Sequence, residues 1–577
     1  MIKSLVAKSI KKVVPGNMPT LLKPKHHDFG DYSFHIKSLG KDVTQKEIEG
    51  LLQELKKDPL YQSVTLDGEF VNLAISHKTL FDEVREILAS QTEYGSSKYG
   101  LKQTWLIEHT SPNPNKALHL GHLRNNILGM AISTIWEKAG ITVIRDCVDN
   151  NRGIAIAKLM WGYLKFARKD ISSPLSINYW QDNKDKWHSA EDLGMNDGEF
   201  IEMLYTKGST DTEELEESAA TVRQMVVDWE AKDKATWDLW TLVLSFSYAA
   251  QRKTLERLGN KWDKVWHEHE HYQEGKDFVE KGLEKNVFKK TPERTIITDL
   301  ESYKLPDTVV IKSDGTSLYI TQDIALTNLK LSTYHPDKLF WVIGSEQSLA
   351  LAQMFAVCEQ LGIGTRDQFT HIAYGLISIK GAGKMSSRKG NVIYIDDLID
   401  EAKKKIIDSR TSITGKKLPE EVAESLALGA IKYSILKVSK NSSIDFDIDE
   451  SINFEGNSGP YLQYTHARMC SVLTKSTMKE HALPSTLPII EDSEQLLCRH
   501  LMIFPEIILE ATQSYNPHTI CMYAYELTQL YNAFYQQCPI LTAPEDNKLF
   551  RLALTQASAT ILRESLRLLG IDAPERL

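Results

Sequence analysis

The stretch that decides the fold is WLIEHTSPNPNKALHLGH, residues 105–122. It starts as a short apolar run, passes through a loop rich in Pro and Asn, and continues into apolar residues that recur at three- and four-residue steps up to Ile135. This spacing predicts a helix, which Gly140 is placed to end. A second apolar run follows at 141–148. Strand, helix and strand in this order predict a βαβ unit, and with it a parallel sheet whose ligand lies at the carboxyl ends of the strands.

Changes of pattern on either side of this unit divide the chain into six predicted segments. The first 27 residues are basic and lack Asp and Glu, which superficially resembles a transit peptide, but they contain no Arg and run into patterned sequence, so a folded N-terminal helix is favoured. Runs at 295–298, 309–312, 318–320 and 339–343 are expected to complete the sheet, and the chain after about residue 400 is expected to be all helix. The fold class is multidomain α/β with a Rossmann-type parallel sheet. The segments are a small α+β N-terminal domain (1–95), the first half of the Rossmann-type core (96–180), a charged, mostly helical insertion (181–290), the second half of the core (291–400), a helical linker (401–455) and an all-α bundle (456–577).

The composition is that of an ordinary globular chain. Its 577 residues leave room for several domains, and 42% hydrophobic with 25% charged residues exclude the disordered and collagen-like classes. No run of about 18 apolar residues occurs, so no membrane-spanning helix is expected. The net charge of −9 gives no general support for a nucleic-acid partner, which must be argued from local features. Six cysteines without a Cys-x-x-Cys pair suit a reducing cytoplasm and predict no structural zinc or other protein-held metal.

His119 and His122 stand at the predicted start of the first helix of the βαβ unit. A helix N-terminus offers free backbone N–H groups and a positive dipole end, which suit phosphate. Three positions apart, the two rings share one helix face and are expected to donate to ATP phosphate oxygens, supplying positive charge rather than removing a proton. Gly121 is expected to let the ligand approach closely. The alternative is a chance coincidence of two histidines and a glycine, which their placement argues against.

The basic loop KMSSRKG, residues 384–390, is the second signature. Lys384 and Arg388 are placed to neutralise the pyrophosphate that leaves ATP, with Met385 and Ser386 beside the nucleotide. A short basic run by itself is more often solvated surface. Together with the histidine motif, and in this order, it predicts a site where ATP activates a second substrate.

These motifs resemble the signatures of class I aminoacyl-tRNA synthetases, and the surrounding sequence resembles the arginyl-tRNA synthetases in particular. The resemblance covers nearly the whole chain, although the insertion matches only loosely. It implies ATP, L-arginine and tRNA(Arg) as substrates, Mg²⁺ bound with ATP, and a requirement for tRNA in the activation step. The matching stretches are residues 108–125, 313–325, 455–468 and 569–576.

Five residues are implied by this resemblance to bind the substrate arginine. A planar guanidinium prefers a carboxylate in bidentate geometry, and a second acid suits the α-ammonium. Each acid taken alone would as readily be a capping or surface residue. Their joint spacing favours the binding role. The implied residues are Glu108, Asn113, Tyr319, Asp323 and Gln347.

The chain departs from the family pattern in two places. Ser387 stands where the basic loop commonly has Lys, and arginyl enzymes without that Lys resemble this chain in carrying one upstream of the histidines, here Lys116. Lys116 is therefore expected to share the phosphate charge with His119, His122, Lys384 and Arg388. Asn151 stands where Asp is commoner in relatives, which leaves its role open.

Both ends of the chain are implied to hold tRNA. The N-terminal domain would grip the outer corner of the tRNA, with Phe70 and Asn72 as candidates, and the C-terminal bundle would bind the anticodon stem and loop. Side chains that stack on or contact bases are sought there. For Tyr535, packing in the core is an equal alternative. The C-terminal candidates are Tyr461, Tyr464, Arg468 and Tyr535. Family habit suggests a monomer.

Two rival functions stay open. Another class I synthetase would share both signatures, but paired acids at Glu108 and Asp323 favour a cationic amino acid. A non-catalytic tRNA-binding paralogue would have no physical need for His119, His122 and Lys384. The sequence therefore predicts an arginine–tRNA ligase.

Overall fold

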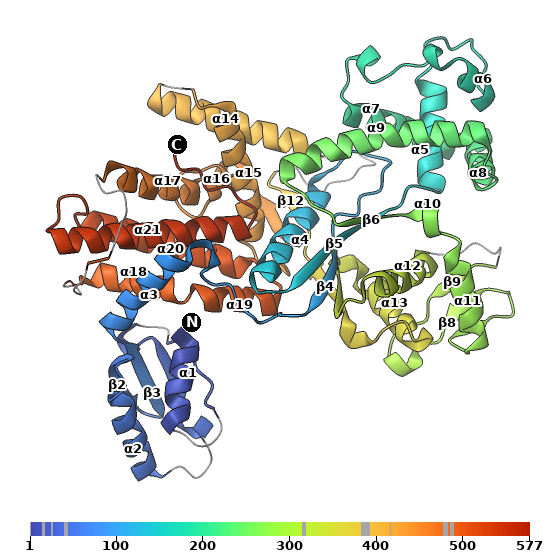
Figure 1. Cartoon of the computed structure of the whole chain (residues 1–577). Coiled ribbons are helices and arrows are strands. Elements are labelled where there is room, and N and C mark those ends of the chain that lie inside the picture. Colours follow the sequence, from blue (N-terminus) through green and yellow to red (C-terminus); the bar gives the residue numbers. More distant parts are fainter. Residues whose placement is uncertain are drawn as a thin grey trace.

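The computed structural model describes residues 2–13, 18–24, 27–39, 44–313, 319–381, 393–415, 417–476, 483, 484, 488 and 490–577. Figure 1 shows a central sheet between the other parts of the chain. The N-terminal domain, in blue, projects below the red and orange C-terminal bundle, and two lobes in green and yellow-green flank the sheet on its other side. The two lobes and the bundle therefore adjoin the sheet, whereas the N-terminal domain adjoins the bundle.

Five parallel strands form this sheet, in the order β11-β10-β4-β5-β6. Read from β6, and numbered along the chain with β4 as the first strand, this is the order 3-2-1-4-5 of a doubly wound sheet. The ligand crevice of such a sheet lies where the order reverses. The predicted parallel sheet is confirmed. The edge strand β6 lies inside the range predicted as insertion, because a run of four residues carries little sequence signal. The strands are β4 (Thr104–Glu108), β5 (Thr142–Asp149), β6 (Lys264–His267), β10 (Lys338–Gly344) and β11 (Phe369–Tyr374).

Three helices pack directly on the sheet. The helix α4 (Leu120–Lys138) joins β4 to β5 as predicted, and Trp136 within it is fully buried. The helices α12 (Tyr319–Tyr334) and α13 (Ser348–Leu361) flank β10 in the chain and share a core with Leu339. The run at 318–320 was expected as a strand, but residues 319 and 320 are the first two of the helix α12, and residue 318 lies outside the described residues.

The lobe between β5 and β6 is helical, as predicted for the insertion, and has a core of its own around Trp180 and Phe200. Its last and longest helix leads back to β6, so the lobe is tied to the sheet at both ends. The helices are α5 (Ile154–Phe166), α6 (Ile177–Asp182), α7 (Asp197–Glu214), α8 (Glu216–Glu230) and α9 (Lys234–Leu258).

The second lobe contains a separate antiparallel sheet, β7-β8-β9. The expectation that the runs at 295–298 and 309–312 complete the parallel sheet is therefore wrong. Three-residue strands on short connections pair antiparallel, whereas a parallel neighbour needs a crossover of about a dozen residues. The elements are α10 (Glu268–His271), α11 (Glu274–Glu284), β7 (Phe288–Lys290), β8 (Ile296–Thr298) and β9 (Val309–Ile311).

Helices dominate the C-terminal part, as predicted, with one exception. The strand β13 (Ile444–Phe446) pairs in parallel with β12 (Ile377–Ile379), so the expectation of helix throughout is wrong there. Such short strands do not stand out from helical periodicity. The helices are α14 (Ile395–Thr414), α15 (Glu420–Leu436), α16 (Ile448–Ser451), α17 (Gly459–Lys475), α18 (Asp492–Met502), α19 (Phe504–Ser514), α20 (His518–Gln537) and α21 (Glu545–Leu568).

The N-terminal domain is an antiparallel sheet, β1-β3-β2, with helices packed on it. The basic start of the chain forms α1, in which Val6 and Ile10 are buried, so the predicted N-terminal helix is confirmed. Asp31 in this domain pairs with Arg499 of the bundle, which fixes the two parts to each other. The elements are α1 (Ile2–Val13), β1 (Tyr32–His35), α2 (Gln45–Lys56), β2 (Tyr61–Asp67), β3 (Phe70–Ile75) and α3 (His77–Ser90).

Candidate active site

The two histidines cap the N-terminus of α4 at the carboxyl end of β4. The His119 Nδ1 accepts a hydrogen bond from the Gly121 amide at 3.2 Å, and the His122 Nδ1 accepts one from the His119 amide, also at 3.2 Å. Since each Nδ1 acts as acceptor, each ring carries its proton on Nε2. Because both Nδ1 atoms are used in capping, the two Nε2–H groups are left as donors for a ligand at the positive end of the helix.

Both rings are uncharged at neutral pH. Burial, with a smaller contribution from nearby Lys116, lowers the pKa of His119 to about 4, and burial also holds the pKa of His122 well below its usual range. The expectation that the histidines supply positive charge is therefore wrong for the unliganded protein. They offer neutral donors, and among the described residues Lys116, which was predicted to share the phosphate charge, acts on both rings with its positive charge.

Gly121 leaves room for the His119 ring. A Cβ at this position would lie 3.1 Å from the Cε1 atom of His119, tighter than an ordinary contact. The missing side chain therefore accommodates the ring in its capping position, and the close approach of a ligand at Gly121 stays a prediction.

The basic loop residues Lys384, Met385, Ser386 and Arg388 lie outside the described residues. The segments on either side of them are fixed to α4. Before the loop, the buried Arg124 donates to the carbonyls of Gly375 at 2.5 Å and Leu376 at 2.9 Å. After the loop, Leu120 donates to the Ile393 carbonyl and Ile395 to the Leu118 carbonyl, both at 3.2 Å. Both flanks of the second signature thus meet the helix that carries the first.

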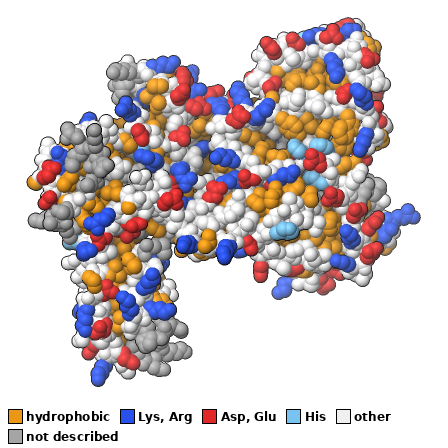
Figure 2. Space-filling model, in the orientation of Figure 1, with side chains coloured by type: hydrophobic (Ala, Val, Ile, Leu, Met, Phe, Trp, Pro, Cys, Tyr) orange, Lys and Arg blue, Asp and Glu red, His pale blue; other side chains and the backbone are white. Residues whose placement is uncertain are grey.

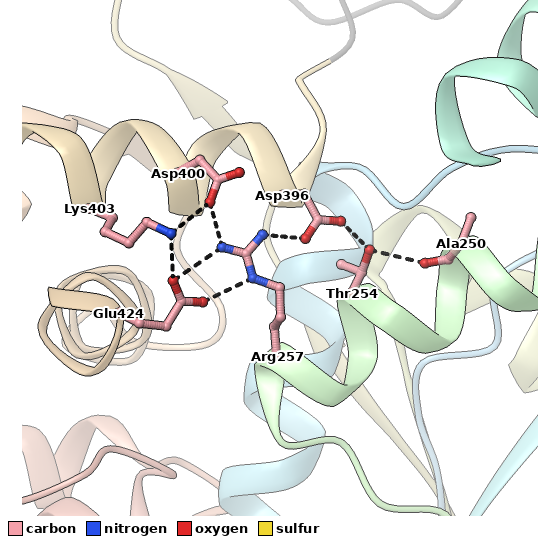
Figure 3. A network of polar contacts seen from close by, with 7 residues as sticks. All are labelled: Ala250, Thr254, Arg257, Asp396, Asp400, Lys403 and Glu424. Atoms are coloured by element: carbon pink, nitrogen blue, oxygen red, sulfur yellow. Dashed lines mark hydrogen bonds and ion pairs between the residues drawn. The ribbon is translucent and has the colours of Figure 1, made fainter. Parts of the chain in front are cut away.

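An ion-pair network holds α14, the helix that follows the loop (Figure 3). The Arg257 guanidinium at the end of α9 contacts Asp396 at 2.5 Å and Asp400 at 2.7 Å on α14, and Glu424 at 2.9 Å on α15. Lys403 lies 3.3 Å from Glu424, and Thr254 donates to Asp396. The network joins the insertion helix to the two helices behind the loop.

Three carboxylates (Glu108, Asp146 and Asp323) and one lysine (Lys330) gather on the other face of the sheet from α4. Glu108, the last residue of β4, is buried, and its Oε2 lies 2.7 Å from Lys330 Nζ while its Oε1 accepts from Ser111 at 3.2 Å. Lys330 Nζ also lies 2.8 Å from Asp146 Oδ2. Sequence reasoning missed Lys330 and Asp146. The available signal was that Lys330 follows Asp323 by two helical turns and so shares its face of α12.

Asp323 stands one step nearer the open end of this site. Its side chain is exposed to water, yet the surrounding protein and the negative charge of Glu108 raise its pKa to about 7. Contact with water moderates the effect of burial, but the upward direction stands because Glu268 adds a second like charge. Glu108 and Asp323, paired in the prediction, therefore act on each other in the structure.

The other three predicted arginine-binding residues lie at the same edge of the sheet. Asn113 is exposed on the loop after β4, and its Oδ1 accepts from Asn150 at 3.1 Å. Tyr319 begins α12, although its side chain is not described. Gln347 is exposed in the turn between β10 and α13. The strand order brings Glu108 and Gln347 to neighbouring strand ends.

Asn151, whose role the sequence left open, is a buried structural link. Its Oδ1 accepts from the His269 amide at 3.2 Å, its Nδ2 lies 3.2 Å from the Tyr248 hydroxyl, and its carbonyl accepts from Trp240 at 2.6 Å. An amide supplies both a donor and an acceptor here, which a carboxylate would not.

A cavity of about 720 Å³ lies in the C-terminal bundle. Three of the four predicted C-terminal candidates line it: Tyr464, Arg468 and Tyr535. The Arg468 guanidinium stands 5.0 Å from the Tyr464 ring centre and 5.9 Å from that of Tyr535. Tyr535 is 42% exposed, which favours contact over packing for that ring. Tyr461 lies outside the cavity lining and accepts from Asn532 at 2.9 Å, the residue that also binds Arg468.

The two N-terminal candidates differ in exposure. Phe70 is 40% exposed and meets His35 edge-on at 4.9 Å between ring centres. Asn72 is 6% exposed in the central strand β3, so its side chain does not reach the surface as it stands.

Charge is mixed over the face drawn in Figure 2, where Lys and Arg alternate with Asp and Glu. Within the described ranges, no three His, Cys, Asp or Glu side chains gather as a metal site, and all six cysteines are free thiols. Of the helices that can be traced, none combines the length and apolar character needed to cross a bilayer.

Comparison with known proteins places these features in one family. Residues 83–448 match the model for the catalytic domain of class I tRNA synthetases of the arginyl group, and residues 462–577 match the DALR anticodon binding domain. The chain belongs to the class I arginyl-tRNA synthetases.

Relatives and solved structures agree with this assignment. The chain is 33% identical to an arginine–tRNA ligase of Phocaeicola vulgatus, with 98% of this chain and 96% of that protein aligned. It is also 33% identical to one from Bacteroides thetaiotaomicron, with 93% and 91% aligned. Arginyl-tRNA synthetase structures from Thermus thermophilus and Plasmodium falciparum share the fold, with TM-scores of 0.78 and 0.77 at 22% and 20% identity over 98% or more of each chain.

Proposed function

We propose that this arginyl-tRNA synthetase forms arginyl-adenylate from L-arginine and ATP at the carboxyl ends of β4 and β10, and transfers the arginyl group to tRNA(Arg). The observation that carries the assignment of the site is the pair of carboxylates Glu108 and Asp323 at the same edge of the sheet as a helix N-terminus with two Nε2–H donors. The acids suit the cationic groups of arginine, and the helix end suits the phosphates of ATP.

Activation needs no general base, because the carboxylate of arginine is already ionised at neutral pH. One of its oxygens attacks the α-phosphorus of ATP, the bond to the bridging oxygen breaks, and pyrophosphate leaves with that electron pair. His119, His122 and Lys116 stabilise the phosphate charge, and Lys384 and Arg388 of the basic loop add cations at the leaving group. Mg²⁺ enters as part of the MgATP substrate.

Transfer to tRNA follows at the same edge of the sheet. A hydroxyl of the terminal ribose attacks the arginyl carbonyl carbon, AMP leaves, and the ester remains on the tRNA. The protein contributes mainly position and charge, since both steps depend on aligned reactants.

The outer parts of the chain are assigned to tRNA recognition. The C-terminal bundle (456–577) would hold the anticodon with Tyr464, Arg468 and Tyr535, whose cavity combines two aromatic faces and a cation. The N-terminal domain (1–95) would contact the tRNA corner through Phe70, with buried Asn72 supporting the strand behind it. The core (96–180 and 291–400), the insertion (181–290) and the linker (401–455) are proposed in the roles predicted above, except that β6 belongs to the core sheet and β7, β8 and β9 form a sheet apart from it. The free thiols fit a reducing cytoplasm. The proposal of a monomer follows from the family resemblance alone.

The direct test is aminoacylation of total tRNA by the purified protein with labelled arginine. The double variant His119→Asn and His122→Asn should lose charging by at least about 100-fold while its tRNA affinity stays within a factor of two. Loss of tRNA binding in step with charging would mean that the histidines only support the fold. A wild-type protein that binds tRNA and charges it with no amino acid would be the non-catalytic rival.

A further inference from the structure

Lys330 is a buried cation between two carboxylates that face each other across neighbouring strands. Glu108 and Asp146 are partners in the register of β4 and β5, so their side chains leave the same face of the sheet side by side. Lys330 Nζ reaches both, at 2.7 Å and 2.8 Å, and its side chain is 1% exposed. Solvent therefore screens this group of charges only weakly.

Two carboxylates in this position repel each other, and each would be costly to bury alone. Asp146 is fully buried and receives one further hydrogen bond, from Trp266 Nε1 at 2.8 Å, while its Oδ1 has no partner. Lys330 therefore does most of the neutralisation. Lys330 Nζ also lies over the Trp341 ring, 5.9 Å from the ring centre.

The charges of the site can be counted from these contacts. Glu108, Asp146 and Asp323 carry three negative charges when ionised, and Lys330 carries one positive charge. A further acid near Asp323 is Glu268, and the Arg152 guanidinium lies 3.6 Å from it and 2.6 Å from Glu230. Glu108, Asp146 and Asp323 together with Lys330 carry two net negative charges, which face the two cationic groups of arginine, its guanidinium and its α-ammonium.

We propose that Lys330 is a positioning residue for arginine recognition, which balances the charge of Glu108 and Asp146, orients Glu108, and sets the charge of the pocket to match the two cationic groups of the substrate. The proposal rests on the function proposed above. It gives Glu108 a fixed geometry, because Oε2 is held by Lys330 and Oε1 accepts a hydrogen bond from Ser111. Lys330 and Asp323 share one face of α12, so one helix carries both a direct ligand and the residue that prepares the other.

Removal of the lysine has a specific consequence. Glu108 and Asp146 would then retain a proton between them at neutral pH, because two adjacent buried carboxylates do not both ionise without a cation. One acid of the pocket would be lost to the substrate. ATP and tRNA contact neither carboxylate in this scheme, so their binding would be preserved.

The test compares KM values for arginine, ATP and tRNA in steady-state aminoacylation by the full-length protein. Lys330→Met should raise KM for arginine by about 10- to 100-fold, the worth of one hydrogen bond to a charged group, with KM for ATP and tRNA within a factor of two. Lys330→Arg should recover most of the loss. The double variant Lys330→Met with Asp146→Asn should bind arginine better than Lys330→Met alone, since removing the second acid restores the charge of Glu108.

A matched control is Lys432→Met. Lys432 is likewise buried, but its Nζ donates to the carbonyls of Leu258 at 2.9 Å and Gly570 at 2.6 Å rather than to carboxylates. This variant should leave KM for arginine unchanged even where it lowers the melting temperature.

Three results would overturn the proposal. KM for arginine could be unchanged in Lys330→Met, KM could rise equally for all three substrates, or the double variant could be no better than the single one. If Lys330→Met does not fold, the double variant is compared with the wild-type protein instead. It lacks the lysine that orients Glu108, so its KM for arginine should rise while KM for ATP and tRNA stays, and an unchanged KM for arginine would overturn the proposal. Failure of the proposed function is a separate outcome, because the wild-type protein would then show no arginine-dependent charging.

Discussion

Two networks in this protein gather several carboxylates around one cation, and they differ chiefly in burial. Arg257 contacts Asp396, Asp400 and Glu424 where the helices α9, α14 and α15 meet, with side-chain exposures of 18%, 33%, 57% and 26% respectively. Lys330 contacts Glu108 and Asp146 beneath the sheet edge, where the corresponding exposures are 1%, 11% and 0%.

The difference shows what each kind of network is suited to. Water and salt screen the Arg257 network, so its acids need no exact balance, and it serves to join three helices behind the basic loop. The Lys330 network cannot be screened, and each charge within it changes the ionisation of the others. An exposed network can vary in composition, whereas the buried one fixes the charge that the substrate meets.

Among the variants that test this comparison, the largest expected effect is on the free energy of unfolding. Lys330→Met leaves two buried carboxylates without their cation and should cost about 3–5 kcal/mol. Arg257→Met removes three partly exposed pairs and should cost about 1–2 kcal/mol. Urea unfolding followed by tryptophan fluorescence measures both, and equal costs would remove the distinction between the networks.

A second prediction separates binding from catalysis. His119→Asn keeps a side-chain acceptor for the helix cap but loses the Nε2–H donor, so kcat for aminoacylation should fall by about 100-fold with KM for arginine within a factor of three. Lys330→Met should show the opposite split. Single-turnover rates at saturating arginine decide between them, and a common pattern in the two variants would show that the sites are not separable.

A third prediction sharpens the comparison through pH. The raised pKa of Asp323 means that this carboxylate is more protonated in weakly acid solution than an ordinary Asp, and it ionises as pH rises. Arginine binds the ionised form, so KM for arginine should fall from pH 6 to pH 8, by up to about tenfold. Because the folded-state pKa is raised, ionisation costs stability as pH rises through 7, and bound arginine offsets that cost. Asp323→Asn should abolish the dependence, whereas Arg257→Met should keep it.

The smallest effect concerns salt. Raising the NaCl concentration should reduce the destabilisation caused by Arg257→Met by an amount under about 1 kcal/mol, because its ion pairs are already weakened by screening. The destabilisation caused by Lys330→Met should be unchanged. A salt effect of similar size on both variants would mean that water reaches the Lys330 network.

Periodicity and local motifs were enough to predict the βαβ unit and the helix that begins after His119. They failed where an element is very short: β8 and β9 were taken for strands of the core sheet, and β6, β7 and β13 were hidden in sequence with a helical pattern. Glu108 and Asp323 could be predicted because they match positions of the family pattern. Asp146 and Lys330 could not, because their meaning depends on strand register and on a helix packed across the sheet. The charge of His119 was also misjudged, since burial is not visible in a sequence.

The most direct test of the arginine-activating function is ATP–pyrophosphate exchange with the purified protein, measured for each amino acid in turn with and without total tRNA. We expect exchange with arginine alone, and only when tRNA is present. Exchange with another amino acid would contradict the assignment of Glu108 and Asp323 to arginine, and no exchange under any condition would contradict catalysis at this site.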